Sequence, residues 1–191
     1  MLAPASGRGQ ANRSFPMLLV TRRRSRLDCP ALAMSDLVDP LQLRPFELAD
    51  ADTVAPWLDG PGLSRPRGSS AWPERLIRDQ RIVAMIGHAG GLRLGLVRLD
   101  CGPDGVADLT LVVAPEHRRR GCGRQMFAQA LQRAREVGMR RLVAYVDLTN
   151  EAAISFFEQV GFVADGLSGD RIRMERLVHA GGHQPPLDVG A

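Results

Sequence analysis

Three stretches rich in apolar residues follow one another in the middle of the chain, and glycines mark the breaks between them. They span residues 81–86, 92–99 and 107–113, with breaks at 88–91 and 102–105. Short apolar segments bounded by glycine-containing turns are typical of antiparallel strands that succeed one another along the chain. This part of the sequence therefore predicts a three-stranded antiparallel meander.

The pattern changes after Pro115, where apolar residues recur at helical spacing. Phe127, Ala130, Leu131 and Ala134 lie at positions i, i+3, i+4 and i+7 and predict the buried face of an amphipathic helix. A strand over residues 142–146 and a second helix are expected next. A meander that continues into strand and helix alternation predicts the α/β class, with a mixed, predominantly antiparallel sheet flanked by helices.

The segment before the meander is expected to add one strand and two short helices. Residues 41–44, followed by Pro45, predict the strand, and residues 72–80 predict the second helix. Residues 48–58 carry Val54, Trp57 and Leu58 at helical spacing and predict the first helix.

The two ends of the chain differ in composition from this central part. Residues 1–33 are rich in Arg, Ser, Pro, Gly and Ala without a sustained apolar period, which predicts a disordered leader. Two interpretations of the leader stay open: an organellar transit peptide, or a misassigned start with translation beginning at Met34. We favour the second. Residues 41–178 are the expected folded domain, and residues 179–191 are an expected flexible tail.

The excess of positive charge lies in the leader. Residues 1–33 hold six Arg and one Asp, whereas residues 34–191 hold 19 Arg against 20 Asp and Glu, and the chain has no lysine. A folded nucleic-acid-binding protein carries its basic patch on the domain itself. We therefore expect no nucleic-acid partner, although binding through the leader remains an alternative. The apolar runs are far shorter than the roughly 20 residues of a membrane-spanning helix, so no membrane association is expected.

Cysteine usage indicates a reducing compartment. The three cysteines, Cys29, Cys101 and Cys122, are odd in number and have no C-x-x-C spacing. Neither a disulfide framework nor a structural zinc site fits this pattern, so we expect a cytoplasmic protein without a bound metal.

The most informative stretch is the turn that connects residues 107–113 to the following helix. It reads APEHRRRGCGRQ and opens a helix whose first N–H groups lack intrahelical partners, so a phosphate can bind there. Gly121 and Gly123 allow a ligand to approach the backbone closely. Counter-charge would come from the neighbouring arginines, which are Arg118, Arg119, Arg120 and Arg124.

Two common phosphate-binding motifs do not match this turn. The dinucleotide fingerprint G-x-G-x-x-G fails because Met126 stands where the third glycine belongs. The nucleoside-triphosphate loop requires a lysine, which the chain lacks. A solvated arginine turn without a ligand is the remaining alternative.

Two motifs, which follow one another along the chain, resemble the signatures of the GNAT superfamily of N-acetyltransferases. Arg118-x-x-Gly121-x-Gly123 resembles its acyl-CoA signature R/Q-x-x-G-x-G/A. Further along, a second stretch is similar to its element N-x-x-A-x-x-x-Y-x-x-x-G-F, with Asn150, Ala153, Phe157, Gly161 and Phe162 at the matching positions. The resemblance covers roughly residues 41–178 and implies a GNAT-like fold with acetyl-CoA as cosubstrate.

The resemblance also implies where acetyl-CoA lies. Its pyrophosphate would bind main-chain amides of roughly residues 119–124, and its pantetheine would lie in a splay between the strands at 107–113 and 142–147. The outward carbonyls and amides of Val112 and Val113 would pair with the pantetheine as an added strand does. The expected cofactor-binding residues are Leu111, Val112, Val113, Arg118, Arg119, Arg120, Gly121, Cys122, Gly123, Arg124, Asn150 and Phe157. A backbone N–H near a bulge of the fourth strand would stabilise the oxyanion formed when an amine attacks the thioester.

The sequence departs from the superfamily at the residue usually assigned to protonate the departing thiolate. That tyrosine is replaced by Phe157, and Tyr145 is the chain's only tyrosine. We interpret Tyr145 as a packed strand residue, with a role as replacement acid as the alternative. The candidate general bases are Asp108 and Glu116, and water-mediated proton transfer is a third possibility.

The acceptor is expected to be the primary amine of a small metabolite. The opening LQLRPFELADADTVAPWLDG, with Trp72, resembles the subgroup that acetylates amino groups of nucleotide-linked sugars. On that interpretation Trp57 and Trp72 stack on the acceptor and Arg65 and Arg67 bind its diphosphate; burial of both tryptophans in the core is the alternative. Acetylation of a protein N-terminus or side chain, and a non-catalytic acyl-CoA-binding module, are the alternative functions. The expected oligomeric state is monomer or homodimer.

Overall fold

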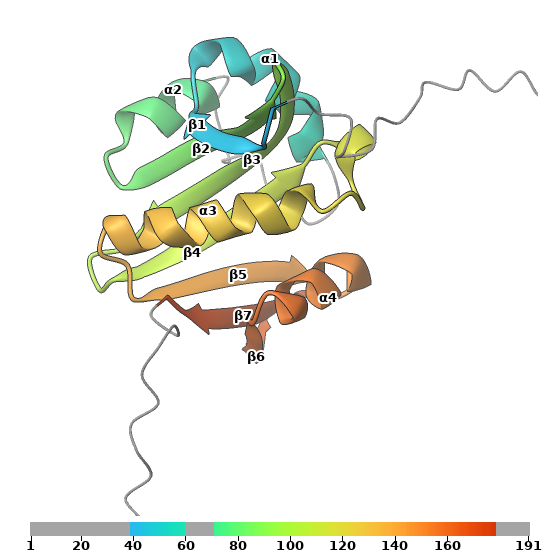
Figure 1. Ribbon diagram of the computed structural model, residues 1–191. Helices are drawn as coiled ribbons and strands as arrows, with labels where there is room; N and C mark the ends of the chain where they lie inside the picture. Colours follow the sequence, from blue (N-terminus) through green and yellow to red (C-terminus); the bar gives the residue numbers. More distant parts are fainter. Residues whose placement is uncertain (1–38, 60–70, 179–191) are drawn as a thin grey trace, which may run out of the picture. The chain divides into compact units, whose positions relative to one another are not determined.

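The computed structural model describes residues 39–59 and 71–178, in which seven strands form one sheet in the order β1-β2-β3-β4-β5-β7-β6 (Figure 1). The strands are β1 (Gln42–Pro45), β2 (Ile82–Ala89), β3 (Leu92–Cys101), β4 (Val106–Val113), β5 (Arg141–Asp147), β6 (Val163–Ser168) and β7 (Arg171–Leu177). All neighbouring strands are antiparallel except β4 and β5, which are parallel. The predicted mixed, predominantly antiparallel sheet is confirmed.

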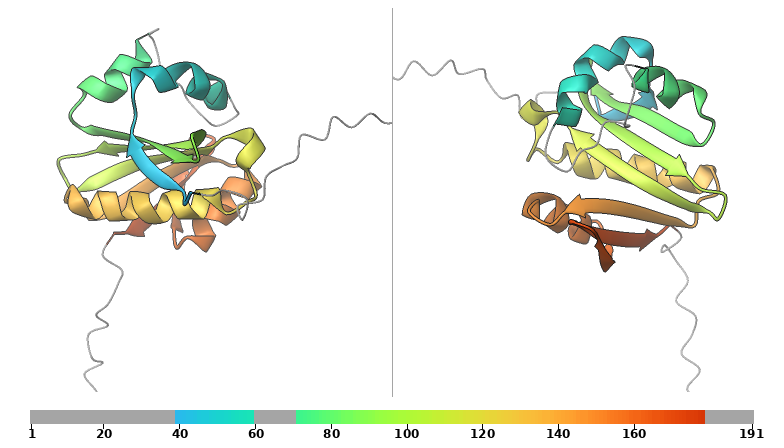
Figure 2. Two further views of the ribbon diagram at one scale, coloured as in Figure 1. Left: turned by 45° about the horizontal axis from the view of Figure 1, so that its top comes forward. Right: turned by 180° about the vertical axis from the view of Figure 1, so that it is seen from behind.

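Helices cover both faces of the sheet. The α-helices are α1 (Ala51–Val54), α2 (Trp72–Arg78), α3 (Cys122–Glu136) and α4 (Glu151–Gln159), and the 3-10 helices are η2 (Leu48–Asp50), η3 (Ala55–Asp59) and η4 (Pro115–His117). Figure 2 shows α3 on one face and α1 and α2 on the opposite face. The sheet is therefore the middle layer of a three-layer α/β domain.

Each face has its own hydrophobic core. The larger core joins α3 and α4 to the sheet and includes Met126, Phe127, Leu142, Phe157 and Met174. The smaller core joins α1, η3 and α2 to the opposite face and includes Phe46, Val54, Trp57, Trp72 and Ile86. Side chains that alternate along β3 and β4 thus point alternately toward α3 and toward α1 and α2.

The single helix expected over residues 48–58 is wrong in one respect. The chain forms three consecutive short helices there, η2, α1 and η3. Pro56 lacks the N–H group that a continuous α-helix would require at this position, so a regular α-helix cannot pass through it. Val54, Trp57 and Leu58 are buried, as their spacing predicted.

The last two strands were not expected from the sequence. After α4, β6 and β7 form an antiparallel hairpin, and β7 lies between β5 and β6. Gly169 adopts φ 63° at the turn of this hairpin, a conformation that favours glycine. The expected leader and tail, residues 1–33 and 179–191, lie outside the described residues. Within the described part of the chain, no helix is long and apolar enough to cross a membrane.

Candidate active site

The parallel strands β4 and β5 pair over only three residues. Val106, Ala107 and Asp108 pair with Arg141, Leu142 and Val143, and the register ends there. The right-hand view of Figure 2 shows the two strands separating beyond this point. The expected splay is therefore present, between the second half of β4 and the second half of β5.

Backbone pairing along β4 decides which of its groups face the splay. The Ala114 N–H donates to the Leu94 carbonyl over 2.9 Å, which fixes the alternation of the β3–β4 ladder. Because alternate residues of a strand direct their backbone groups to opposite sides, Val112 pairs with β3, whereas Leu111 and Val113 face β5. The expected outward orientation of the Val112 backbone is therefore wrong. The side chain of Val112 is buried in the smaller core.

The expected bulge of β4 is also absent from the described ladder. Pairing between β3 and β4 is continuous from Gly95 opposite Val113 to Cys101 opposite Ala107. The register shift lies instead between β2 and β3, where Gly87 pairs with Gly95 and His88 pairs with Arg93. Leu94 is the additional residue, so the irregularity belongs to β3.

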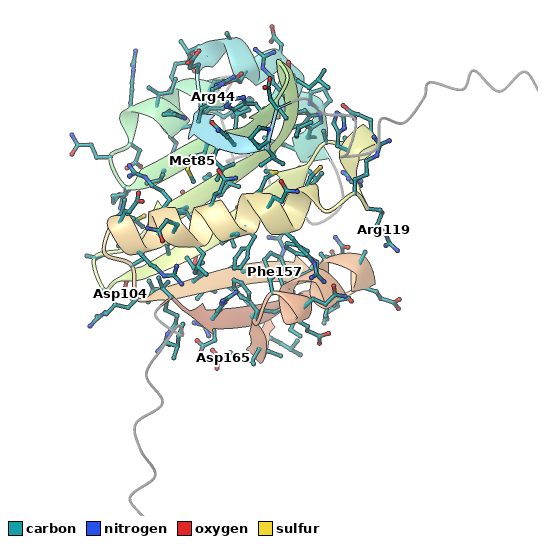
Figure 3. The ribbon with its side chains drawn as sticks, in the orientation of Figure 1. Arg44, Met85, Asp104, Arg119, Phe157 and Asp165 are labelled. Carbon is teal, nitrogen blue, oxygen red and sulfur yellow. The ribbon has the colours of Figure 1, made fainter. Side chains whose placement is uncertain are left out.

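Two left-handed residues shape the turn between β4 and α3. Arg119 has φ 62°, which is uncommon for a residue with a side chain, and Gly121, the N-cap of α3, has φ 84°. A Cβ atom added at Gly121 would have no atom within 4 Å. The turn therefore holds the backbone at the start of α3 open to its surroundings, as an anion-binding turn requires. Figure 3 shows the Arg119 side chain extending away from the fold at this turn.

The arginine side chains of this turn have different partners. Arg118 Nε donates to the Val113 carbonyl over 3.1 Å, and Arg124 Nη2 donates to Gln159 Oε1 over 2.6 Å. The Arg124 N–H donates to the Gly121 carbonyl over 3.1 Å. The backbone and side chain of Arg124 thus have partners within the protein, and its side chain links α3 to α4.

Gly123 provides close packing between α3 and its neighbours. A Cβ atom at this position would lie 3.3 Å from Phe156 Cε2 and 3.5 Å from Val113 Cγ2. The adjacent Cys122 side chain is buried, and this burial raises the pKa of its thiol. The helix N-terminus would favour a thiolate, but burial outweighs it. The Cys122 side chain therefore serves packing.

The second motif places its two expected residues at the start and in the middle of α4. Asn150 is the N-cap, and its Oδ1 accepts a hydrogen bond of 3.1 Å from the Ala153 N–H. Phe157 is buried, with its ring centroid 5.3 Å from that of Phe156 and 5.0 Å from that of Phe162 (Figure 3). An aromatic cluster thus holds α4 against the sheet.

A cavity of about 640 Å³ follows the splay and connects the two faces of the sheet. Of the expected site residues, those that line it are Asp108, Leu111, Val112, Val113, Arg118, Arg119, Gly123, Asn150 and Phe157. Those that do not line it are Glu116, Arg120, Gly121, Cys122 and Arg124. Glu116 lies in η4 with an exposed side chain, so the structure does not bring it to the cavity.

Carboxylates gather where the cavity opens on the face of α1 and α2. Asp108 lies directly opposite Asp100 in the β3–β4 ladder, and Arg98 Nη2 binds Asp100 Oδ2 over 2.7 Å. Asp108 is accessible from solvent, yet the surrounding protein and the nearby Asp100 raise the pKa of its carboxyl group. Asp100 was missed in the sequence because its opposition to Asp108 depends on the register of the hairpin.

The residues of the opening segment are structural. Trp57 and Trp72 are 6% and 7% exposed and belong to the smaller core, so they are not available as stacking platforms. Asp50 is fully buried and accepts hydrogen bonds of 2.6 Å from Arg44 and from Arg93. Burial opposes its charged form, but these bonds prevail and hold the pKa of Asp50 well below its usual range. Arg65 and Arg67 lie outside the described residues.

A sequence model of the acetyltransferase (GNAT) family matches residues 33–162, more than half of the 191 residues. The chain belongs to this family. GNAT enzymes are acetyl-CoA-dependent N-acetyltransferases that act on amines, so the expected family, enzyme class and cosubstrate are confirmed. Among the residues that the structure describes, no group of three or more His, Cys, Asp or Glu could hold a metal ion.

Two relatives are similar to this chain over different lengths. Phosphinothricin N-acetyltransferase from Streptomyces viridochromogenes is 25% identical over 166 residues, covering 79% of this chain and 85% of that protein. Mycothiol acetyltransferase from Cellulomonas flavigena is 47% identical over 49 residues, covering 26% of this chain and only 14% of that protein.

Solved structures of GNAT enzymes share the fold. Spermidine N-acetyltransferase from Vibrio cholerae, in complex with CoA and spermine, has a TM-score of 0.62 and 22% identity, covering 72% of this chain and 95% of that one. The PaiA N-acetyltransferase from Thermoplasma acidophilum, in complex with coenzyme A, has a TM-score of 0.58 and 19% identity, covering 72% and 99%.

Proposed function

We propose that this chain transfers the acetyl group of acetyl-CoA to the primary amine of a small cationic metabolite. One observation carries the proposal: the cavity that Arg118, Arg119 and Gly123 line at the start of α3 extends through the splay of β4 and β5 to Asp108. Cofactor and acceptor would enter from opposite faces of the sheet and meet in the splay. Positioning of the two reactants then supplies much of the rate enhancement.

The cofactor would lie on the side of α3 and α4. The Leu111 carbonyl and the backbone groups of Val113 would pair with the pantetheine as an added strand does, and the turn before α3 would bind the pyrophosphate. Arg118 covers the Val113 carbonyl, so its side chain would move when the pantetheine takes that carbonyl. Arg119, which lines the cavity, would add charge beside the phosphates.

The acceptor would approach Asp108. Arg98 neutralises Asp100, whereas the side-chain carboxylate of Asp108 forms no hydrogen bond or ion pair with the residues that the structure describes. An ammonium group would therefore be attracted to Asp108, which would take its proton through a contact or one water molecule. The amine then attacks the thioester carbonyl, a C–N bond forms, and the C–S bond breaks. The Leu111 N–H, at the free edge of β4, is positioned to stabilise the oxyanion.

A free small amine is favoured over a nucleotide-linked amino sugar. Both tryptophans that would stack on a sugar or base are buried, and Arg44 and Asp50 of the opening segment bind each other. The relatives act on phosphinothricin and on spermidine, which are small amines. Monomer or homodimer remains the expected state and the cytoplasm the expected location.

The replacement of tyrosine by Phe157 favours one rival function, a module that binds acyl-CoA without transferring the acyl group.

Isothermal titration of the full chain with acetyl-CoA tests the cofactor site, with desulfo-CoA and adenosine diphosphate as comparators. Thiol release from acetyl-CoA is then followed with spermidine, phosphinothricin, glucosamine and a nucleotide-linked amino sugar. Binding without thiol release from any amine, including an N-terminal peptide, would support the rival. Absence of binding would overturn the cofactor site itself.

A further inference from the structure

The proposed transfer leaves a thiolate that must be protonated, and the second GNAT motif offers no donor for it. Phe157 lines the cavity at the position of the usual tyrosine but carries no ionisable group. If the reaction takes place in this cavity, another group on its wall can supply the proton. The assignment of that group rests on the proposed function.

The polar residues that line the cavity differ greatly as proton donors. A guanidinium group does not give up its proton in a protein, and an ionised carboxylate is a hydrogen-bond acceptor only. Thr149 already donates its hydroxyl hydrogen to Asp147 over 2.5 Å. A phenol has an ordinary pKa of about 10 and a thiol one of about 8.5, so a tyrosine is the best matched of these side chains. Tyr145 is the tyrosine of this wall.

The position of Tyr145 on β5 fits this task. It follows Val143, the last residue of β5 that pairs with β4, by two residues, so its side chain is on the same face as Asp108. Continuing the register places Tyr145 across the splay from Thr110. The thioester is expected between these two residues, beside the free N–H of Leu111.

The Tyr145 side chain is not packed in the core. Its neighbours Ala144 and Val146 are 2% and 5% exposed, whereas Tyr145 is 40% exposed. The described residues form no hydrogen bond to its hydroxyl group, and the opposite residue on β7, Arg173, binds Asp165 and Glu175 instead. The expectation of a packed strand aromatic is therefore wrong. Tyr145 presents a phenol to the cavity.

We propose that the Tyr145 hydroxyl is the acid that protonates the departing thiolate of CoA. As the C–S bond breaks, its electron pair goes to sulfur, and sulfur takes the phenolic proton. The proton removed from the attacking ammonium through Asp108 returns to the phenolate by way of water. The attacking nitrogen loses its second proton to water as the C–S bond breaks. The acetylated amine, the free thiol of CoA and this one proton are the products, with no net change at either residue.

The test uses the full chain and three variants: Tyr145→Phe, Phe157→Tyr and the double variant. Thiol release is measured with acetyl-CoA and the amine of the panel above that reacts fastest. We expect Tyr145→Phe to lower kcat at least about tenfold while the KM for acetyl-CoA changes less than about twofold. The double variant should recover much of the loss, because Phe157→Tyr restores a phenol on the other wall. Thr110→Val, which removes the hydroxyl across the splay, is the matched control and should lower kcat much less.

A second readout needs no acceptor. The ultraviolet absorbance of the thiolate gives the pKa of the CoA thiol bound to each protein, with the desulfo-CoA complex subtracted to remove tyrosine and cysteine signals. A phenol that donates to the thiolate lowers this pKa, so we expect a value higher by about one in Tyr145→Phe than in the unaltered chain. Wild-type kcat in Tyr145→Phe, or an unchanged thiol pKa, would overturn the role of Tyr145 and leave the proposed function standing. An unaltered chain that binds CoA but releases no thiol would contradict the function, and the thiol pKa would still decide the contact with Tyr145.

Discussion

Asp108 of β4 faces Asp100 of β3 directly across the antiparallel ladder, at the closed end of the splay between β4 and β5. Directly opposite residues of such a pair have Cα atoms about 5.5 Å apart, so the two carboxyl groups share one environment. Arg98 binds Asp100, and Asp108 is the carboxylate of this pair that we propose as the general base. Burial first, and then the like charge of Asp100, raise the pKa of Asp108, and a raised pKa makes a carboxylate a stronger base.

Asp108→Asn is expected to lower kcat by about 100-fold, because a positioned general base contributes about 100-fold or more. Activity should rise with pH as Asp108 loses its proton, which gives the acidic limb of the kcat/KM profile. Asp100→Asn removes one cause of the raised pKa of Asp108 and should move this limb to lower pH. Asp104→Asn is the graded control, since Asp104 has the same sign but a smaller influence on that pKa. An acidic limb unmoved in Asp100→Asn would contradict this coupling.

Gly121→Asp should weaken acetyl-CoA binding at least about tenfold by adding a negative charge where the pyrophosphate is proposed to bind. Gly91→Asp is a matched control, because Gly91 and Gly121 have φ 79° and 84° and a Cβ atom at either would have no atom within 4 Å. Both variants carry the same conformational strain of about 1–2 kcal/mol. Isothermal titration should show lost affinity only in Gly121→Asp; equal affinity in both would refute the placement of the pyrophosphate.

Asp50→Asn should destabilise the fold at neutral pH by about 3 kcal/mol, because Arg44 and Arg93 lose their shared carboxylate. The pKa of Asp50 in the folded state is lowered, so its stabilising contribution is complete above the unfolded-state pKa of about 3.9 and declines as pH falls below it. Urea denaturation of both proteins at pH 7 and at about pH 3 measures this. The difference in free energy of unfolding between them should shrink in acid; a constant difference would mean that the charge of Asp50 is not what stabilises the fold.

Gly95→Ala should destabilise the protein more than Gly87→Ala. A Cβ atom at Gly95 would clash with the Val112 carbonyl oxygen in the adjacent strand, and backbone cannot move aside easily. At Gly87 the nearest atom is Met126 Sδ, 2.9 Å away, at the end of a flexible side chain. We expect a loss of about 2–3 kcal/mol for Gly95→Ala and about 1 kcal/mol or less for Gly87→Ala. Thermal denaturation decides, and equal losses would show that β3 can shift to admit the methyl group.

The parts of the site that can be predicted from sequence are contiguous in the chain. Gly121, Gly123 and Asn150 stand in short motifs whose spacing carries the information, and the meander is evident because glycines mark its turns. The register between two strands cannot be predicted in this way, because it depends on how many residues a turn or a bulge contains. The opposition of Asp100 to Asp108, and the orientation of the Val112 backbone toward β3, depend on such register and cannot be predicted from local patterns.

Burial is harder to predict where one face of a strand is open. Val143 and Tyr145 lie on the same face of β5, yet Val143 is buried and Tyr145 is exposed, because the helices on that face cover another part of the sheet. The α-helix within residues 48–58 ends at Val54 because of Pro56, and the apolar spacing conceals this end because it continues past the proline.

The short pairing of β4 with β5 has a mechanical consequence. Only three residue pairs join β4 to β5 in the described structure, so a four-stranded and a three-stranded half of the sheet meet along a narrow seam. A pantetheine chain hydrogen-bonded in the splay would extend that seam and couple the halves as a missing strand would. The cosubstrate would then stiffen the domain, and the amides of Leu111 and Val113 would be the first to slow their hydrogen exchange when acetyl-CoA binds.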